Sequence, residues 1–114
     1  MASSPAQGIT GGAFAPGPSC RAAPTGRGAL NNLRFAVKDL IDVAGFVTGG
    51  GNPDWRRSHG PAKATSPAVS RLLAAGAELI GRTVSDELAF SLEGENVHDG
   101  TPLNPACPDR LPGG

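Results

Sequence analysis

The sequence predicts an α/β fold in which a strand, a helix and a second strand follow one another along the chain. Residues 33–37 alternate apolar with polar or small side chains and include aromatic and β-branched members, as strands do. Residues 66–80 open with Ser-Pro, a side-chain cap followed by proline at the first helical position, and carry apolar residues at helical spacing. Residues 79–83 favour a second short strand. A strand, helix and strand in this order predict a parallel sheet with flanking helices.

The segments between these elements are short or rich in glycine. Residues 39–43 continue the apolar run of the first strand, and residues 48–53 must form a loop because they hold three consecutive glycines. Gly76 lowers helix propensity by about 1 kcal/mol, so it either allows close packing or ends the helix early. A second short helix is expected over residues 86–91, with Glu87 in its first turn.

Residues 1–28 differ in composition from the rest and predict a disordered leader. Gly, Ala, Pro and Ser fill 19 of these 28 positions, so too little apolar area is available to offset the entropy of ordering them. The segment lacks the apolar core of a signal peptide, although its arginines and its lack of acidic residues also fit a transit peptide. We favour the disordered leader and expect a cytoplasmic protein.

Composition excludes several functional classes. Ten basic residues balance ten acidic ones, which argues against phosphate-neutralising nucleic-acid binders and against polybasic membrane-surface modules. No run approaches the roughly 20 apolar residues of a membrane-spanning helix. The two cysteines, Cys20 and Cys107, form neither a CxxC motif nor a disulfide framework, so both are expected to be free thiols.

Lys38 is the position that most suggests chemistry. It directly follows the apolar residues 35–37, and burial of a lysine can lower its pKa until the amine acts as a base near neutral pH. The alternatives are a solvent-exposed lysine at a sheet edge, or a lysine paired with Asp39 or Asp42.

Two other features carry weaker signals. The glycines at 49–51 could hold an anion on their backbone amides, but they match no nucleotide-binding spacing, and a plain turn is the preferred interpretation. Four side chains of metal-binding type lack ligand-like spacing, so we expect neither a metal nor a cofactor; they are His59, His98, Asp99 and Cys107.

Residues 33–114 resemble the amidase signature family through five ordered motifs. The run Phe35 to Gly45 (FAVKDLIDVAG) is similar to the family's lysine-bearing segment. The motifs that follow in order are residues 65–76 (TSPAVSRLLAAG), 81–83 (GRT), 86–89 (DELA) and 100–105 (GTPLNP). Residues 49–55 and 94–96 most resemble the indole-3-acetamide hydrolase branch, and residues 112–114 resemble the start of the family's Gly/Ser-rich signature.

The resemblance implies an amidase that hydrolyses carboxamides to a carboxylate and ammonia through a Ser–cis-Ser–Lys triad. It also implies a large α/β fold with a mixed sheet and flanking helices, of which this chain is the N-terminal fragment. It implies that Lys38 is the triad lysine and that Ser91 lies near the substrate. The expected substrate is a small-molecule amide, with no nucleic-acid or membrane partner. Residues 29–114 are then the N-terminal part of the amidase domain, and both catalytic serines would come after Gly114.

This chain alone is therefore expected to be inactive. Arg82 stands where the family more often has lysine, and we expect that position at the surface. The alternative to an amidase fragment is a non-catalytic module that binds a partner through an exposed sheet edge.

Overall fold

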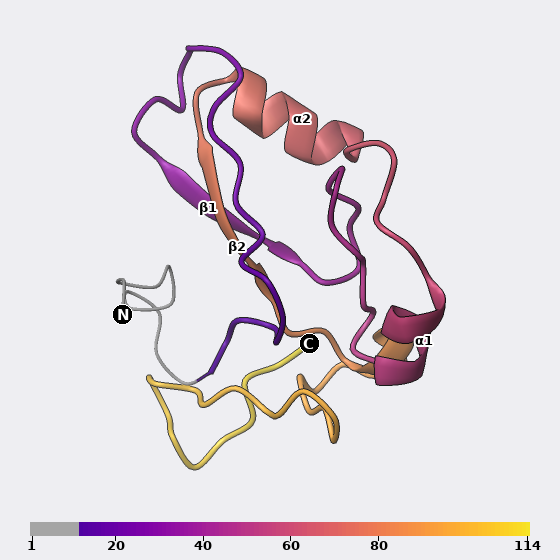
Figure 1. Cartoon of the computed structure of the whole chain (residues 1–114). Coiled ribbons are helices and arrows are strands. Elements are labelled where there is room, and N and C mark those ends of the chain that lie inside the picture. The colour runs from indigo at the N-terminus through magenta and orange to yellow at the C-terminus, as the bar shows by residue number, and fades with distance from the viewer. Residues whose placement is uncertain (1–11) are drawn as a thin grey trace.

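The computed structural model describes residues 12–114, and its centre is a pair of parallel strands (Figure 1). Strand β1 spans Arg34–Lys38 and strand β2 spans Glu78–Thr83, which confirms both predicted strands to within one residue. The pairing runs from Arg34 opposite Glu78 to Lys38 opposite Thr83. One extra residue in β2, Ile80, forms a bulge between the pairs that Phe35 and Ala36 make.

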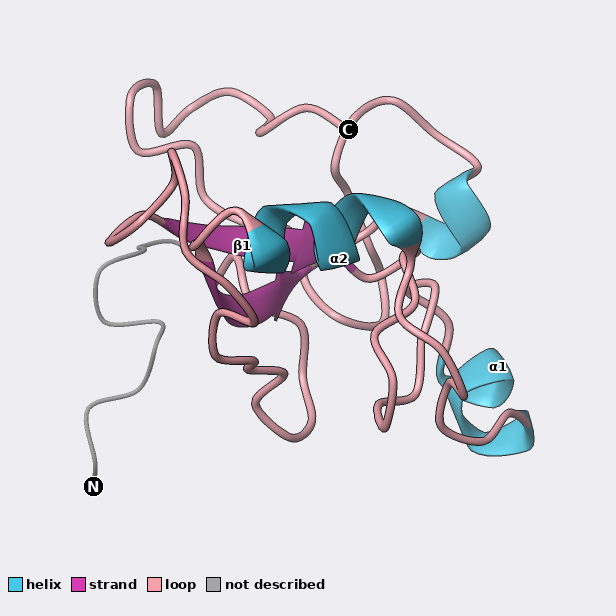
Figure 2. Ribbon diagram, turned by 90° about the horizontal axis from the view of Figure 1, so that it is seen from above, coloured by secondary structure: helices cyan, strands magenta, loops and turns pink. Residues whose placement is uncertain are grey.

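Helix α2 (Pro67–Ala74) connects the strands and lies across one face of the sheet (Figure 2). It begins at the predicted proline and buries Val69 and Leu73. The helix ends before Gly76, whose φ of +107° lies in the left-handed region that favours glycine. Gly76 therefore ends the helix and frees the following residues to enter β2.

A short helix that the sequence interpretation missed, α1 (Pro53–Ser58), follows the glycine loop. The Asn52 side chain accepts a hydrogen bond from the backbone N–H of Trp55, and Pro53 occupies the first helical position. The same Asn-Pro signal in the sequence could have revealed this helix. The second predicted helix shrinks to one 3₁₀ turn, η2 (Glu87–Ala89), because Leu88 and Ala89 adopt positive φ.

Residues 12–28 differ from the disordered leader that composition predicted. Phe14 and Ala22 form antiparallel bridges with Thr83 and Leu79, so this segment runs beside the edge of β2 that faces away from β1 (Figure 1). Cys20 within it is 2% exposed. The edge of β2 supplies backbone hydrogen bonds that a composition argument cannot foresee. Residues 1–11 of the expected leader lie outside the described residues.

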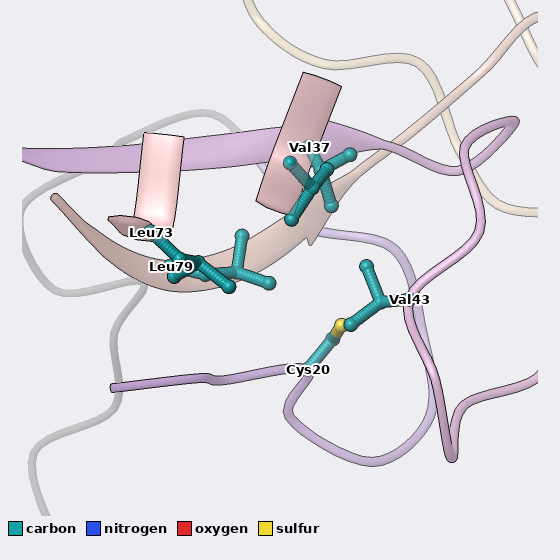
Figure 3. Packing of buried hydrophobic residues seen from close by; sticks show 6 residues of the cluster. Cys20, Val37, Val43, Leu73 and Leu79 are labelled. Carbon is teal, nitrogen blue, oxygen red and sulfur yellow. The ribbon is translucent and has the colours of Figure 1, made fainter. Parts of the chain in front are cut away.

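The hydrophobic core lies between the sheet, α2 and the segment around Cys20. Figure 3 shows Cys20, Val37, Val43, Leu73 and Leu79 converging there, and each is at most 6% exposed. Small and aliphatic side chains from the segment around Cys20, from β1 and the residues after it, from α2 and from β2 thus pack into one core. None of the helices in the described part of the chain is long and apolar enough to cross a bilayer.

Candidate active site

Lys38 is the last residue of β1 and lies half-buried opposite Thr83. Neither acidic neighbour holds it. Within residues 12–114, the ion pairs of Asp39 run to arginines, and Asp42 accepts a hydrogen bond from the Thr48 hydroxyl at 2.6 Å. The alternative of a lysine paired with Asp39 or Asp42 is therefore wrong in this structure.

Asp39, the next residue, is buried and highly connected. Its carboxylate accepts hydrogen bonds from the backbone N–H of Gly49 at 2.9 Å, from Arg82 at 3.2 Å and from Arg56 at 3.5 Å. Its backbone N–H donates to the carbonyl of Thr83 at 3.0 Å. These contacts compensate the charge of a carboxylate that is 2% exposed, and they fix the backbone directly after Lys38.

Arg82 corrects the expectation of a surface position. Its side chain is 8% exposed and projects from β2 toward Asp39, and it also donates to the carbonyl of Val47. One Nη lies 3.7 Å from the sulfur of Cys20. Burial raises the pKa of the Cys20 thiol, while the charge of Arg82 and its hydrogen bond oppose that rise.

Arg56, in α1, contacts both Asp39 and Asp99 and so connects the Asp39 carboxylate to the C-terminal part of the chain. One Nη lies 2.9 Å from Asp99 and 3.5 Å from Asp39. Burial lowers the pKa of Arg56, but the hydrogen bonds and charges of Asp99 and Asp39 together outweigh burial and raise the pKa overall. Asp39, Arg56, Arg82 and Asp99 together form one network, which we call the Asp39 network.

The glycine loop at 49–51 forms the expected turn, in which the N–H of Asn52 donates to the carbonyl of Gly49 at 3.1 Å, and the loop also contacts Asp39. The N–H of Gly49 donates to the Asp39 carboxylate, and the N–H of Gly50 donates to the Asp39 carbonyl at 2.8 Å. The Gly51 carbonyl accepts a hydrogen bond from the Asn96 side chain at 2.9 Å. The N–H groups of Gly49 and Gly50, two of the amides that a bound phosphate would need, are thus already engaged.

Ser91 and Lys38 together line neither of two cavities, one beside η2 and one beside β2. Ser91 is exposed and lines a hollow of about 700 Å³ with residues from η2 and from the segment 95–101. A second cavity, of about 460 Å³, lies beside β2 and is lined by Cys20, Asp39, Arg56 and Arg82 among others. Lys38 lines neither of these two, so the structure does not bring Lys38 and Ser91 into a shared cavity. The contact of Ser91 with substrate remains a prediction.

The side chains considered for a metal site are dispersed. His59 stacks on Trp55, and Asp99 belongs to the Asp39 network. His98 contacts Glu87 at 3.0 Å. Within the range 12–114, no three His, Cys, Asp or Glu side chains gather closely enough to hold a metal ion. Cys20 and Cys107 are both free thiols.

Known proteins place this arrangement in one family. The family model Amidase matches residues 18–114. Amidase 1 of Oryza sativa subsp. japonica is 60% identical over 85 residues, which make up 75% of this chain and 20% of that protein. Outer envelope protein 64, chloroplastic, of Arabidopsis thaliana is 55% identical over 85 residues, which are 75% of this chain and 14% of that protein.

A solved structure agrees with these matches. It belongs to a protein complex that reveals the evolutionary origins of an s-triazine catabolic enzyme. Its TM-score is 0.72 at 40% identity, and the match covers 76% of this chain and 19% of that chain. The chain thus spans about a fifth or less of the length of the relatives it matches. With a family match that extends over most of its residues, the chain belongs to the amidase family.

Proposed function

We propose that residues 29–114 are the N-terminal part of a carboxamide hydrolase in which Lys38 is the base. One observation carries the proposal. Lys38 lies half-buried at the carboxyl end of β1, and no carboxylate within residues 12–114 forms an ion pair with it. An amine without a carboxylate partner is available to a hydroxyl group.

The reaction would follow the resemblance to the amidase signature. Lys38 takes a proton from a bridging serine, which deprotonates the nucleophilic serine as that serine attacks the amide carbonyl. Lys38 returns this proton through the bridging serine to the amide nitrogen, which leaves as ammonia and gives an acyl-enzyme, and water then releases the carboxylic acid. Both serines would come from residues beyond Gly114. Small carboxamides, including aryl-acetamides such as indole-3-acetamide, are the proposed substrates.

The Asp39 network would support this chemistry by holding Lys38 in a fixed position. It holds the backbone after Lys38 to the end of β2, to the glycine loop and to α1. A base works only when its nitrogen stays within hydrogen-bond reach of the hydroxyl that gives up the proton. A rigid strand end therefore favours the relay. Asp39 is therefore a positioning residue in this proposal.

Exposed apolar side chains fit a chain that is part of a larger protein. Phe90, Leu92 and Val97 are 92%, 88% and 88% exposed. Large apolar groups so open to water are unfavourable unless another surface covers them. The remaining four-fifths of an amidase of the relatives' length would supply that surface.

The test compares two polypeptides. The first is the chain of residues 1–114. The second, called the extended polypeptide below, joins residues 1–114 to the part of rice Amidase 1 that follows its matching segment. Ammonia release from indole-3-acetamide and benzamide should stay at background for the first and rise clearly above it for the second. Turnover by the chain alone that is lost on Lys38→Ala would overturn the proposed inactivity, and an inert but folded extended polypeptide would contradict the proposed activity.

A second candidate is the non-catalytic module. The edge of β1 that faces away from β2 has no partner strand within residues 12–114, and Leu33 beside it is 55% exposed. Such an edge can receive a strand from another protein. The transcript distinguishes the candidates: an open frame that continues past codon 114 into a serine- and glycine-rich segment supports the hydrolase, whereas a stop codon followed by unrelated sequence supports the module.

A further inference from the structure

Asp86 is a buried carboxylate that the site described above does not use. It follows β2 closely and is 2% exposed. Both of its carboxylate oxygens lack a hydrogen-bond partner within residues 12–114. Burying a carboxylate in this way is strongly unfavourable, and native proteins supply donors to such groups. Asp86 therefore needs donors that this part of the chain does not provide.

The backbone around Asp86 is held in place from several sides. Its carbonyl accepts hydrogen bonds from the Ser85 hydroxyl at 2.7 Å and from the N–H of Ala89 at 2.9 Å. The Asn96 side chain donates to the carbonyl of Ser85 at 2.8 Å. With its main chain fixed so closely, Asp86 is set at a definite place rather than on a loose loop.

That place adjoins Gly114. The N–H of Gly113 donates to the carbonyl of Glu93 at 3.0 Å, and the N–H of Gly114 donates to the carbonyl of Leu92 at 2.8 Å. A Cβ built on Gly114 would lie 3.0 Å from Oδ2 of Asp86. The backbone of Gly114 therefore lies close to the unpartnered carboxylate of Asp86.

Acidic side chains lie near Asp86, so its carboxylate needs hydrogen-bond donors and not further acidic groups. Glu93 and Glu95 lie close by: the hydrogen bond between them raises the pKa of Glu95, and the charge of Asp86 contributes to that rise. No arginine or lysine of residues 12–114 forms an ion pair with Asp86. Main-chain N–H groups and hydroxyls suit such a carboxylate, because they bind it without a further large side chain.

We propose that Asp86 is a docking site for the residues that directly follow Gly114 in a longer polypeptide. Its two oxygens accept hydrogen bonds from the main-chain N–H groups or hydroxyls of those residues. This docking requires only that the polypeptide continue beyond Gly114. Its consequence for catalysis rests on the proposed function, because the resemblance puts the serine-rich signature at that point. Asp86 would then be a positioning residue for the segment that carries the bridging serine.

Hydrogen exchange in the extended polypeptide tests the docking without any measurement of activity. The amides of the first residues after Gly114 should be protected in the parent. Asp86→Ala should speed their exchange by about tenfold or more, and Asp86→Asn, which keeps one acceptor, should have a smaller effect. The matched control is Asp109→Ala, which removes an exposed carboxylate from the same part of the chain and should leave these rates unchanged.

Equal protection in the Asp86→Ala variant and the control, or no protection in the parent, would overturn the proposal. If Asp86→Ala does not fold, hydrogen exchange in Asp86→Asn and a crystal structure of the parent test the docking instead. The crystal structure should place an N–H or hydroxyl of the new segment within hydrogen-bond distance of Asp86, whereas a bound cation or a water-filled gap there would contradict docking. Intact protection in a polypeptide that hydrolyses no amide would refute the proposed function and leave the docking site standing.

Discussion

The carboxylate of Asp39 and the guanidinium of Arg82 meet where the two parallel strands end, with Oδ1 and Nη1 3.2 Å apart. Their side chains are 3% and 8% exposed. The first residue follows β1 and the second lies in β2, so the pair closes the sheet at the end where Lys38 lies. An ion pair in this place couples the geometry of the candidate base to the integrity of the sheet.

Asp39→Ala should destabilise the extended polypeptide by about 3–5 kcal/mol, because it leaves two arginines without their shared, buried partner. Urea unfolding measures this change. The matched control is Glu78→Ala, which breaks the exposed pair between Glu78 and Arg21 and should cost no more than about 1 kcal/mol. Similar losses in the two variants would show that burial does not set the strength of the Asp39 network.

Gly51→Ala should be more harmful than Gly45→Ala, although both glycines have positive φ. Their φ angles are +72° and +87°, so each alanine meets backbone strain of about 1–2 kcal/mol. A Cβ at Gly51 would also lie 2.7 Å from the carbonyl oxygen of Ser85, whereas a Cβ at Gly45 meets nothing within 4 Å. Thermal unfolding of the two variants should therefore separate clearly, and equal midpoints would contradict the close approach of the glycine loop to Ser85.

The stability of the extended polypeptide should fall in acid partly through Glu87. Hydrogen bonds with His98 and then Asn52 lower the pKa of this carboxyl group. A pKa depressed in the folded state gives stability that is present above the unfolded value, about 4.3, and is lost as the pH falls through the folded value. Glu87→Gln should thus flatten the pH dependence of unfolding below about pH 5. If the stability of that variant falls in acid as steeply as that of the parent, the Glu87 carboxyl group has the same pKa in the folded and the unfolded state.

The sequence predicted the elements that local patterns control. Alternation marked β1, a short run after Gly76 marked β2, and the Ser66-Pro67 pair marked the start of α2. The end of α2 depended on whether Gly76 would pack or terminate the helix, and its left-handed backbone decided that question.

Contacts between distant residues could not be predicted in this way. Asp39 and Arg82 are 43 positions apart, and their meeting depends on the strand register and on the bulge at Ile80. The ordering of residues 12–28 has the same origin, because the free edge of β2 exists only after the sheet has formed. Arg82 follows the apolar residues Leu79 and Ile80 in β2, and a charged side chain at this place was a signal of a buried acidic partner.

Lys38→Ala in the extended polypeptide tests the central claim most directly. The account predicts that ammonia release from a carboxamide falls by at least about 10³-fold, because the relay loses its base, while the urea midpoint changes little. Lys63→Ala, which removes an exposed lysine, should retain full turnover. Turnover of the Lys38→Ala variant equal to that of the parent and of the Lys63→Ala control would contradict the assignment of Lys38 as the base.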